Sequence, residues 1–297
     1  TCVPDNAASY KTMEYAGCWI GKNVGGTLGM PMEWNRQEND MTYYTHEMTG
    51  EPLPNDDLDI QILWLIALED QGLSLDCKVL GQYFNELMIF THAEYGTAKT
   101  NLRAGLQPPV SGTHNNDFKD SCGSFIRSEI WACLFPGHPQ RAAEYAFQDA
   151  VVDHGNGEGV YAEVFVAAME AAAFFETDVR RLVEIGLSYI PASCAVARAA
   201  RRAIECVEAG MDRRAARKVM LEEWIGHIEW HYISPEDEAA GYKGGKMGWD
   251  VPSNLFIVVY SLLRCAGNFD DSILTAVSFG EDTDCTAGTI AALYGLM

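Results

Sequence analysis

Apolar residues along this chain recur at the spacing of α-helices, and the alternation typical of strands is almost absent. Residues 56–70, DDLDIQILWLIALED, begin with carboxylates and then carry apolar side chains on most of their surface. Residues 161–175 are alanine-rich and apolar nearly all round, as in a buried helix. The pattern predicts further helices at residues 178–190, 193–209, 211–225, 253–265 and 270–279, and a last one that begins at Thr283 or Asp284. We therefore predict an all-α fold.

Glycines mark the ends and one face of several predicted helices. Gly210 stands between two of them, where a residue with a left-handed backbone often ends a helix, and Gly280 ends the helix before the last. Glycines at every fourth position lie along one face of an N-terminal helix, where they let a neighbouring helix approach its backbone closely. These are Gly17, Gly21, Gly25 and Gly29.

No internal repeat, low-complexity segment or linker divides the sequence. Its 297 residues are 48% hydrophobic, which suffices for a substantial core. We therefore expect a single domain over residues 1–297, and a monomer. The longest stretch without helical periodicity, residues 233–252, contains Trp249 and predicts a surface loop that covers a site.

The charge balance is strongly acidic, with a formal net charge of -21. That balance argues against a nucleic-acid partner, because no basic stripe is present to neutralise phosphates. An anionic small ligand stays possible if helix N-termini or a bound cation hold it. The longest apolar run, residues 255–263, ends at Arg264 and is too short to span a membrane.

The cysteines are scattered singly, and their number, nine, is odd. No C-x-x-C pair occurs, so free thiols in a reducing cytoplasm are the expected state. The first residues, TCVPDNAASYK, do not form a signal peptide. These observations predict a cytoplasmic protein.

Two clusters of aspartates each stand at the start of an apolar helix. They are Asp56-Asp57-x-Asp59 and Asp282-x-Asp284, the second preceded by Glu281. One or two acids at such a place are typical of N-capping and of dipole compensation, which stays the alternative for either cluster alone. Three carboxylates are more than capping needs. Because carboxylate oxygens are the ligands that Mg²⁺ and Mn²⁺ prefer, we expect the two clusters to face each other and hold one or two ions.

Other polar residues carry weaker signals. Glu33 follows the first helix closely and is free to point into a cleft. His154 precedes a buried helix, a place where a histidine by itself is more often structural than catalytic. His227 and His231 have i, i+4 spacing but lack the glutamate position of the zinc-protease motif, so we interpret them as one face of a helix.

Four segments together resemble the ADP-ribosylglycohydrolase family, in the order that this family has. GCWIGKNVGGTLGMPMEW is similar to its opening helix, and NDDLDIQILW resembles its Thr/Ser-Asp-Asp metal motif. GSFIRSEIW and the following FQDAVVDHGNGEG resemble its Gly-x-x-x-Arg and Thr-His segments. GEDTDCTAG resembles its Gly-x-Asp-Thr-Asp-Thr motif. The resemblance spans residues 14–296 and is weak over residues 178–245.

The resemblance implies a compact helical fold with two Mg²⁺ or Mn²⁺ ions at the base of a cleft. The implied metal ligands are Asn55, Asp56, Asp57, Asp282, Asp284 and Cys285. The implied catalytic residues are Glu33, Asp57 and Asp284. The implied substrate-binding residues are Gly123, Ser124 and His154.

The sequence departs from the family pattern at three of these places. Asn55 replaces the Thr or Ser of the first motif, although its amide oxygen is still a possible ligand. Cys285 replaces a Thr, and a thiol is poorly matched to Mg²⁺. Asp153 replaces the Thr before His154. The number of ions, one or two, is therefore open.

The implied activity is hydrolysis of the glycosidic bond at the anomeric carbon of ADP-ribose attached to a protein or small-molecule acceptor. Three alternatives remain. The substrate is another N-riboside or nucleoside, or the chain has lost catalysis and acts as a binding protein. The third is an all-α isoprenoid synthase, whose D-D-x-x-D motif Asp56-Asp57-x-Asp59 imitates, but its second motif, N-D-x-x-S-x-x-x-E, is missing.

Overall fold

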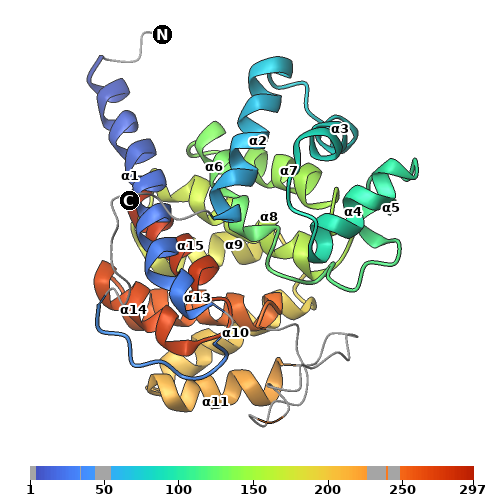
Figure 1. Cartoon of the computed structure of the whole chain (residues 1–297). Helices are drawn as coiled ribbons and strands as arrows, with labels where there is room; N and C mark the ends of the chain where they lie inside the picture. Colours follow the sequence, from blue (N-terminus) through green and yellow to red (C-terminus); the bar gives the residue numbers. More distant parts are fainter. Residues whose placement is uncertain (1–4, 34, 44–54, 226–238, 240–247) are drawn as a thin grey trace.

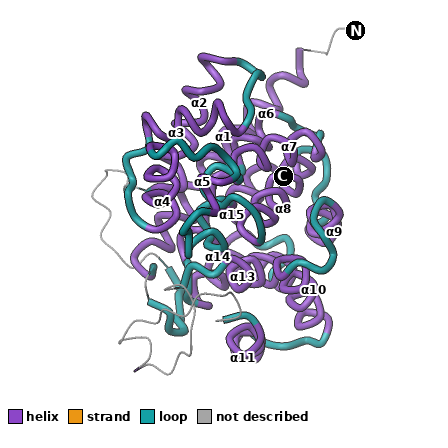
Figure 2. The backbone as a smooth tube through the Cα atoms, turned by 90° about the vertical axis from the view of Figure 1, so that its right-hand side faces the viewer, coloured by secondary structure: helices purple, strands orange, loops and turns teal. Residues whose placement is uncertain are grey.

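The computed structural model describes residues 5–33, 35–43, 55–225, 239 and 248–297, and within these ranges the protein is helical and contains no strand. Figure 2 shows the helices joined by loops and turns. The predicted all-α fold is confirmed. The predicted helix face with His227 and His231, and most of the predicted loop at residues 233–252, lie outside the described residues.

The helices follow one another along the chain as labelled in Figure 1. They are α1 (Asp5–Gly29), η1 (Met30–Met32), α2 (Asp56–Gln71), α3 (Cys77–Leu87), α4 (Ala93–Arg103), α5 (Val110–Thr113), η2 (Phe125–Arg127), α6 (Glu129–Leu134), α7 (Pro139–Ala150), α8 (Glu158–Ala173), α9 (Val179–Ser188), α10 (Ala195–Glu208), α11 (Arg213–Glu223), α13 (Val251–Arg264), α14 (Phe269–Phe279) and α15 (Thr283–Leu296). The predicted helices at residues 56–70 and beyond residue 160 lie within about three residues of these bounds. Helices α3 to α7 were not predicted from the sequence pattern.

The ends of the predicted helices have the expected chemistry. Gly210 after α10 has φ +69° and Gly280 after α14 has φ +80°, a backbone that glycine adopts without steric cost. Helix α2 begins with Asn55, whose side-chain oxygen accepts a hydrogen bond from the backbone N–H of Asp57.

Helices α1 and α15, from opposite ends of the described chain, pack directly on each other (Figure 1). A Cβ atom added to Gly21 would lie 2.1 Å from the carbonyl oxygen of Ala291, and one added to Gly29 would lie 2.3 Å from that of Thr283. Only glycine fits at such distances. The predicted close approach of a second helix to the glycine face is confirmed, and it brings residues near 30 next to residues near 284.

Helix α8 lies at the centre of the molecule and is buried on all sides (Figure 1). Its Phe165 and Met169 belong to a large apolar cluster with α10, α13 and α15, while its Ala167 and Ala171 pack in a second cluster with α2, α3 and α7. Because both faces are covered, the helix carries apolar residues all round. No helix of the described chain is long and apolar enough to cross a membrane.

Candidate functional site

The turn before α15 is held in a strained conformation. Gly280 and the non-glycine Glu281 both have positive φ, +80° and +65°. The buried carboxylate of Glu281 pairs with Nε of Arg36 at 3.2 Å, which ties the turn to the segment after α1. The turn places Asp282 at the N-cap of α15, yet the Asp282 side chain makes no capping hydrogen bond. Capping therefore does not account for this acid.

At the start of α2, the cap is Asn55 and not an aspartate. Oδ1 of Asn55 accepts from the backbone N–H of Asp57 at 2.8 Å, and Nδ2 donates to Oδ2 of Asp284 at 3.3 Å. The amide oxygen that we predicted as a metal ligand is therefore used by the helix. The side that faces Asp284 is an N–H donor, which does not bind a cation.

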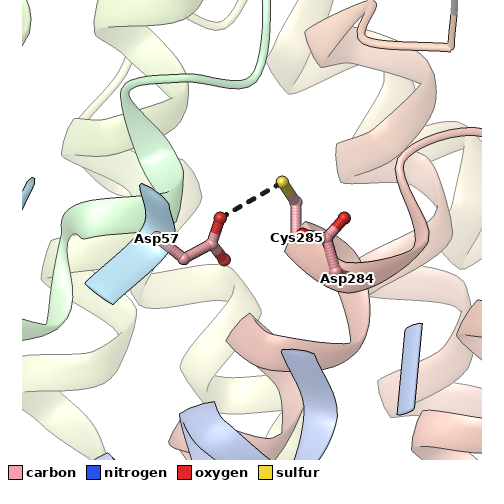
Figure 3. Close-up of side chains that lie close together, drawn as sticks. All are labelled: Asp57, Asp284 and Cys285. Atoms are coloured by element: carbon pink, nitrogen blue, oxygen red, sulfur yellow. Dashed lines mark hydrogen bonds between the residues drawn. The ribbon is translucent and has the colours of Figure 1, made fainter. Parts of the chain in front are cut away.

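The two acid clusters meet, as the sequence predicted. Ligand atoms of Glu33, Asp282 and Asp284 lie within 4.8 Å of one another, and so do those of Asp57, Asp284 and Cys285 (Figure 3). Among the described residues, one oxygen of Asp282 and one of Asp284 have no hydrogen-bond partner although both side chains are almost fully buried. Buried oxygens of this kind need a partner, and a divalent cation would supply it.

Burial and mutual repulsion raise the pKa values of these acids. Burial, with the charges of Asp282 and Asp56, raises the pKa of Glu33 to about 8. Burial likewise raises the pKa of Asp282 to about 7. It raises the pKa of Asp284 well above its usual range, since Asp282 and Glu33 lie close by. A cluster that resists holding several negative charges together is suited to an added positive ion.

Lys22 lies beneath the cluster and is 1% exposed. It comes from α1, and its Nζ lies 3.0 Å from Oδ2 of Asp57 and 2.8 Å from Oε1 of Glu129. Burial alone would lower the pKa of Lys22, but the charges of Asp57 and Glu129 outweigh burial and raise it. The lysine is therefore a permanent cation inside the protein. Lys22 had no predicted role; its place on the glycine-lined helix indicated only that another helix lies close to it.

The thiol of Cys285 is engaged with Asp57. Its Sγ lies 3.4 Å from Oδ1 of Asp57, with the thiol as the donor (Figure 3). Burial, followed by the charges of Asp282 and Asp284, raises the pKa of the thiol well above its usual range. Because a metal binds the thiolate, this environment does not favour Cys285 as a ligand.

A cavity lies next to the acid cluster. Several predicted site residues line it, namely Glu33, Asp56, Gly123, Asp282, Asp284 and Cys285. Trp249 also lines it, and the remaining lining residues had no predicted role: His92, Ala93, Glu94, Tyr95, Ser121, Cys122 and Ile126. Tyr95 donates to Oδ2 of Asp56 at 3.1 Å. Trp249, from the segment predicted to cover a site, also hydrogen-bonds to Glu33.

Two residues predicted to bind substrate do not line this cavity. Ser124 is buried and donates its hydroxyl to the carbonyl of Gly159 at 2.7 Å. His154 is fully buried, with Nδ1 2.9 Å from Oδ1 of Asp153 and Nε2 3.5 Å from Oγ of Ser121. Both side chains therefore lie behind the residues that line the cavity, and His154 is connected to the cavity only through lining residues such as Ser121. The segments that cover it, around Ser121 and Glu94, carried no signal in the sequence.

Asp153, which replaces a Thr of the family pattern, belongs to a buried ion network. Nη2 of Arg127 lies 2.7 Å from Oδ1 of Asp153 and 2.8 Å from Oδ1 of Asp149. Although burial opposes ionisation, the Arg127 guanidinium and His154 hold the pKa of Asp153 below its usual range. This acid is therefore paired within the protein and does not lie on the cavity surface.

The donor set fits a hard divalent cation. Glu33, Asp282 and Asp284 line the cavity and offer only carboxylate oxygens, which suit Mg²⁺ or Mn²⁺. Asp57 takes no part in the cavity lining, because it lies behind Cys285 against Lys22. An ion between the three carboxylates would border the cavity that they line.

Comparisons with known proteins identify the family and the fold. Residues 9–297 match the family described as ADP-ribosylglycohydrolase. A solved structure described as "ADP-ribosylglycohydrolase-related protein complex" has a similar fold, with a TM-score of 0.61 and 16% sequence identity over 96% of this chain and 87% of that chain. No curated protein matches the sequence. The family match sets aside the isoprenoid synthase alternative.

Proposed function

The chain belongs to the ADP-ribosylglycohydrolase family of glycosidases, and we propose that it is a metal-dependent hydrolase of an ADP-ribosyl bond at the anomeric carbon. The acceptor is a protein or a small molecule. The observation that carries the proposal is the convergence of Glu33, Asp282 and Asp284 at a cavity wall, with buried carboxylate oxygens that lack a partner. Capping does not explain Asp282.

In this proposal, two of the carboxylates would bind the ion and the third would transfer a proton. Asp282 and Asp284 hold the ion, and their turn is anchored by the Arg36–Glu281 pair. A bound Mg²⁺ or Mn²⁺ would polarise a water or ribose hydroxyl beside the anomeric carbon. Glu33 borders both the ion position and the cavity, so its carboxyl moves the proton between water and leaving group. Gly123 lines the same cavity, where the absence of a side chain leaves room for the carboxylate of Glu94 beside it.

A second candidate substrate is a neutral N-riboside such as a nucleoside. The described residues that line the cavity include five carboxylates and no lysine or arginine. Such a wall favours ribose hydroxyls over a diphosphate, unless the ion or backbone N–H groups compensate the negative charge. The two substrates differ in the adenosine diphosphate group that only the ADP-ribosyl substrate carries on its ribose. A binding protein without catalysis remains the third candidate.

Calorimetry with metal-free protein tests the proposal. ADP-ribose and ribose-bearing nucleosides are titrated with and without Mn²⁺ into the wild type, into Asp284→Asn and into the control Asp270→Asn, an exposed acid in the first turn of α14. We expect Mn²⁺-dependent binding of ADP-ribose to the wild type and the control only. Hydrolysis of arginine-, serine- and base-linked ribosides then identifies the leaving group.

Each result has a definite meaning. Binding of nucleosides without ADP-ribose would move the proposal to the second candidate. Tight binding of ADP-ribose without turnover of any linked substrate would favour the binding protein. Absence of Mn²⁺ binding in the wild type would contradict the catalytic proposal.

A further inference from the structure

We propose that the ammonium group of Lys22 takes the electrostatic place of a second metal ion, so that the site binds one divalent cation and not two. This inference rests on the proposed function and concerns the metal content of the same site. It departs from the two ions implied by the family resemblance.

The acid cluster has two sides that differ in what the protein already supplies. On the cavity side, Glu33, Asp282 and Asp284 lie together, and one oxygen of each aspartate has no partner among the described residues. No described lysine or arginine contacts these three carboxylates at ion-pair distance. This side has the charge and the unpaired oxygens for one ion.

The inner side is the second possible ion position, between Asp57, Asp284 and Cys285. Protein groups already contact the candidate ligand atoms there. Oδ2 of Asp57 lies 3.0 Å from Nζ of Lys22, and Oδ1 of Asp57 accepts from the Cys285 thiol at 3.4 Å. Oδ2 of Asp284 accepts from Nδ2 of Asn55 at 3.3 Å. An ion at this position would have to displace three donors, one of them a buried cation.

Lys22 is built into the fold at this position. Its partners are Asp57 at the start of α2 and Glu129 at the start of α6, and a Gln61 amide donates to the second oxygen of Glu129 at 2.8 Å. Its side chain passes Gly288 of α15, where an added Cβ would lie 3.3 Å from Lys22 Cδ. Lys22, Asp57, Glu129 and Gln61 are all buried and form one connected network. The lysine therefore cannot move away without leaving the carboxylates of Asp57 and Glu129 without their cation.

A second cation close to Lys22 would be repelled by it. Two positive charges that share Asp57 in a buried region repel more strongly than they would in water. The thiol adds a further cost, since it would have to lose its proton before it could bind the ion. The inner position is therefore filled by the protein itself.

The test counts Mn²⁺ ions per chain in the full-length protein, without substrate. Metal-free protein is titrated with Mn²⁺, and bound ions are counted by calorimetry and by the electron paramagnetic resonance signal of the free ion. We expect one ion for the wild type. Lys22→Met removes the charge at similar length and should admit a second ion, whereas Glu129→Gln leaves the ammonium on Asp57 and should keep one.

A second pair of variants decides the matter if Lys22→Met does not fold. Asp57→Asn should still bind one ion, and Asp282→Asn should bind none. Two ions in the wild type, or loss of the ion in Asp57→Asn, would overturn the inference and leave the proposed hydrolase intact. One ion in both the wild type and a folded Lys22→Met would overturn the role of Lys22. No ion in the wild type would refute the proposed function itself.

Discussion

Gly25 of α1 lies so close to α15 that a Cβ atom added to it would be 2.2 Å from the carbonyl oxygen of Ala287. The contact joins two backbones, so no side-chain rotation can relieve a clash there. Through it, the segment that carries Lys22 and Glu33 is held against the segment that carries Asp284.

Gly25→Ala should destabilise the protein by at least about 1–3 kcal/mol, because the two helices must separate to admit the methyl group. Urea unfolding followed by circular dichroism measures the loss. Gly26→Ala is the matched control in the same helix, where the added Cβ would meet the side chain of Asn55, with Nδ2 at 3.1 Å, and no backbone. Equal losses in both variants would contradict the importance of the backbone contact.

Asp284→Asn should abolish stabilisation by Mn²⁺. In the wild type, an ion present at about a hundred times its dissociation constant should stabilise the folded state by about 2.7 kcal/mol, because it binds only that state. The variant keeps the shape of the side chain but loses the charge shared by both groups of candidate ligands. Thermal unfolding with and without Mn²⁺ measures the difference. Asp270→Asn should respond to Mn²⁺ as the wild type does.

The metal-free protein should become less stable as the pH rises from about 5 to about 8. The pKa values of Glu33, Asp282 and Glu281 in the folded state are raised to about 8, 7 and 7. In this range the folded protein therefore holds protons that the unfolded chain has released, and the free energy of unfolding falls with pH. The slope should be on the order of 1 kcal/mol per pH unit for each such group.

Urea unfolding in the presence of a chelator, at several pH values, measures this slope. Saturating Mn²⁺ should flatten it, since the ion replaces the protons, and Asp282→Asn should reduce it without metal. A metal-free protein that gains stability over the same range would show that these carboxyls are already ionised and compensated.

Arg127→Met should destabilise the fold by roughly 3–5 kcal/mol, because it leaves Asp149 and Asp153 buried without their cation. Arg127→Lys should recover little of this, since one ammonium cannot reproduce the several hydrogen bonds that the guanidinium makes to the two acids. Unfolding of both variants at neutral pH checks the order. A stable Arg127→Met would mean that the network is not required for folding.

Sequence periodicity predicted the helices whose apolar pattern is strongest. Helices α8 and α13 are apolar nearly all round because the core surrounds them, and α2 carries its acids at the expected end. Helix α4 is short and mostly polar, so its pattern resembles that of an irregular segment, whereas α3 does carry apolar residues at helical spacing, a signal that the prediction did not use. Their stability depends on the helices that they pack against.

The candidate site was predictable where charge is locally concentrated. Asp56, Asp282 and Asp284 stand out in the sequence, and the structure brings them together at one cavity. The pairing of Lys22 with Asp57 could not be read from the sequence, because it depends on how far α1 approaches α2. Local sequence likewise does not record that His154 is covered by other segments.

The packing of α1 against α15 also determines when the site can form during synthesis. A ribosome produces Glu33 early, but Asp282 and Asp284, which lie with it, are among the last described residues to be made. Until then the glycine face of α1 has no helix to cover it, and the contacts that complete the cluster have high sequence separation. A nascent chain that has not reached α15 thus contains most of the core but an incomplete cluster of candidate ligands. Binding of an ion there would therefore require that α15 has been made and has packed on α1.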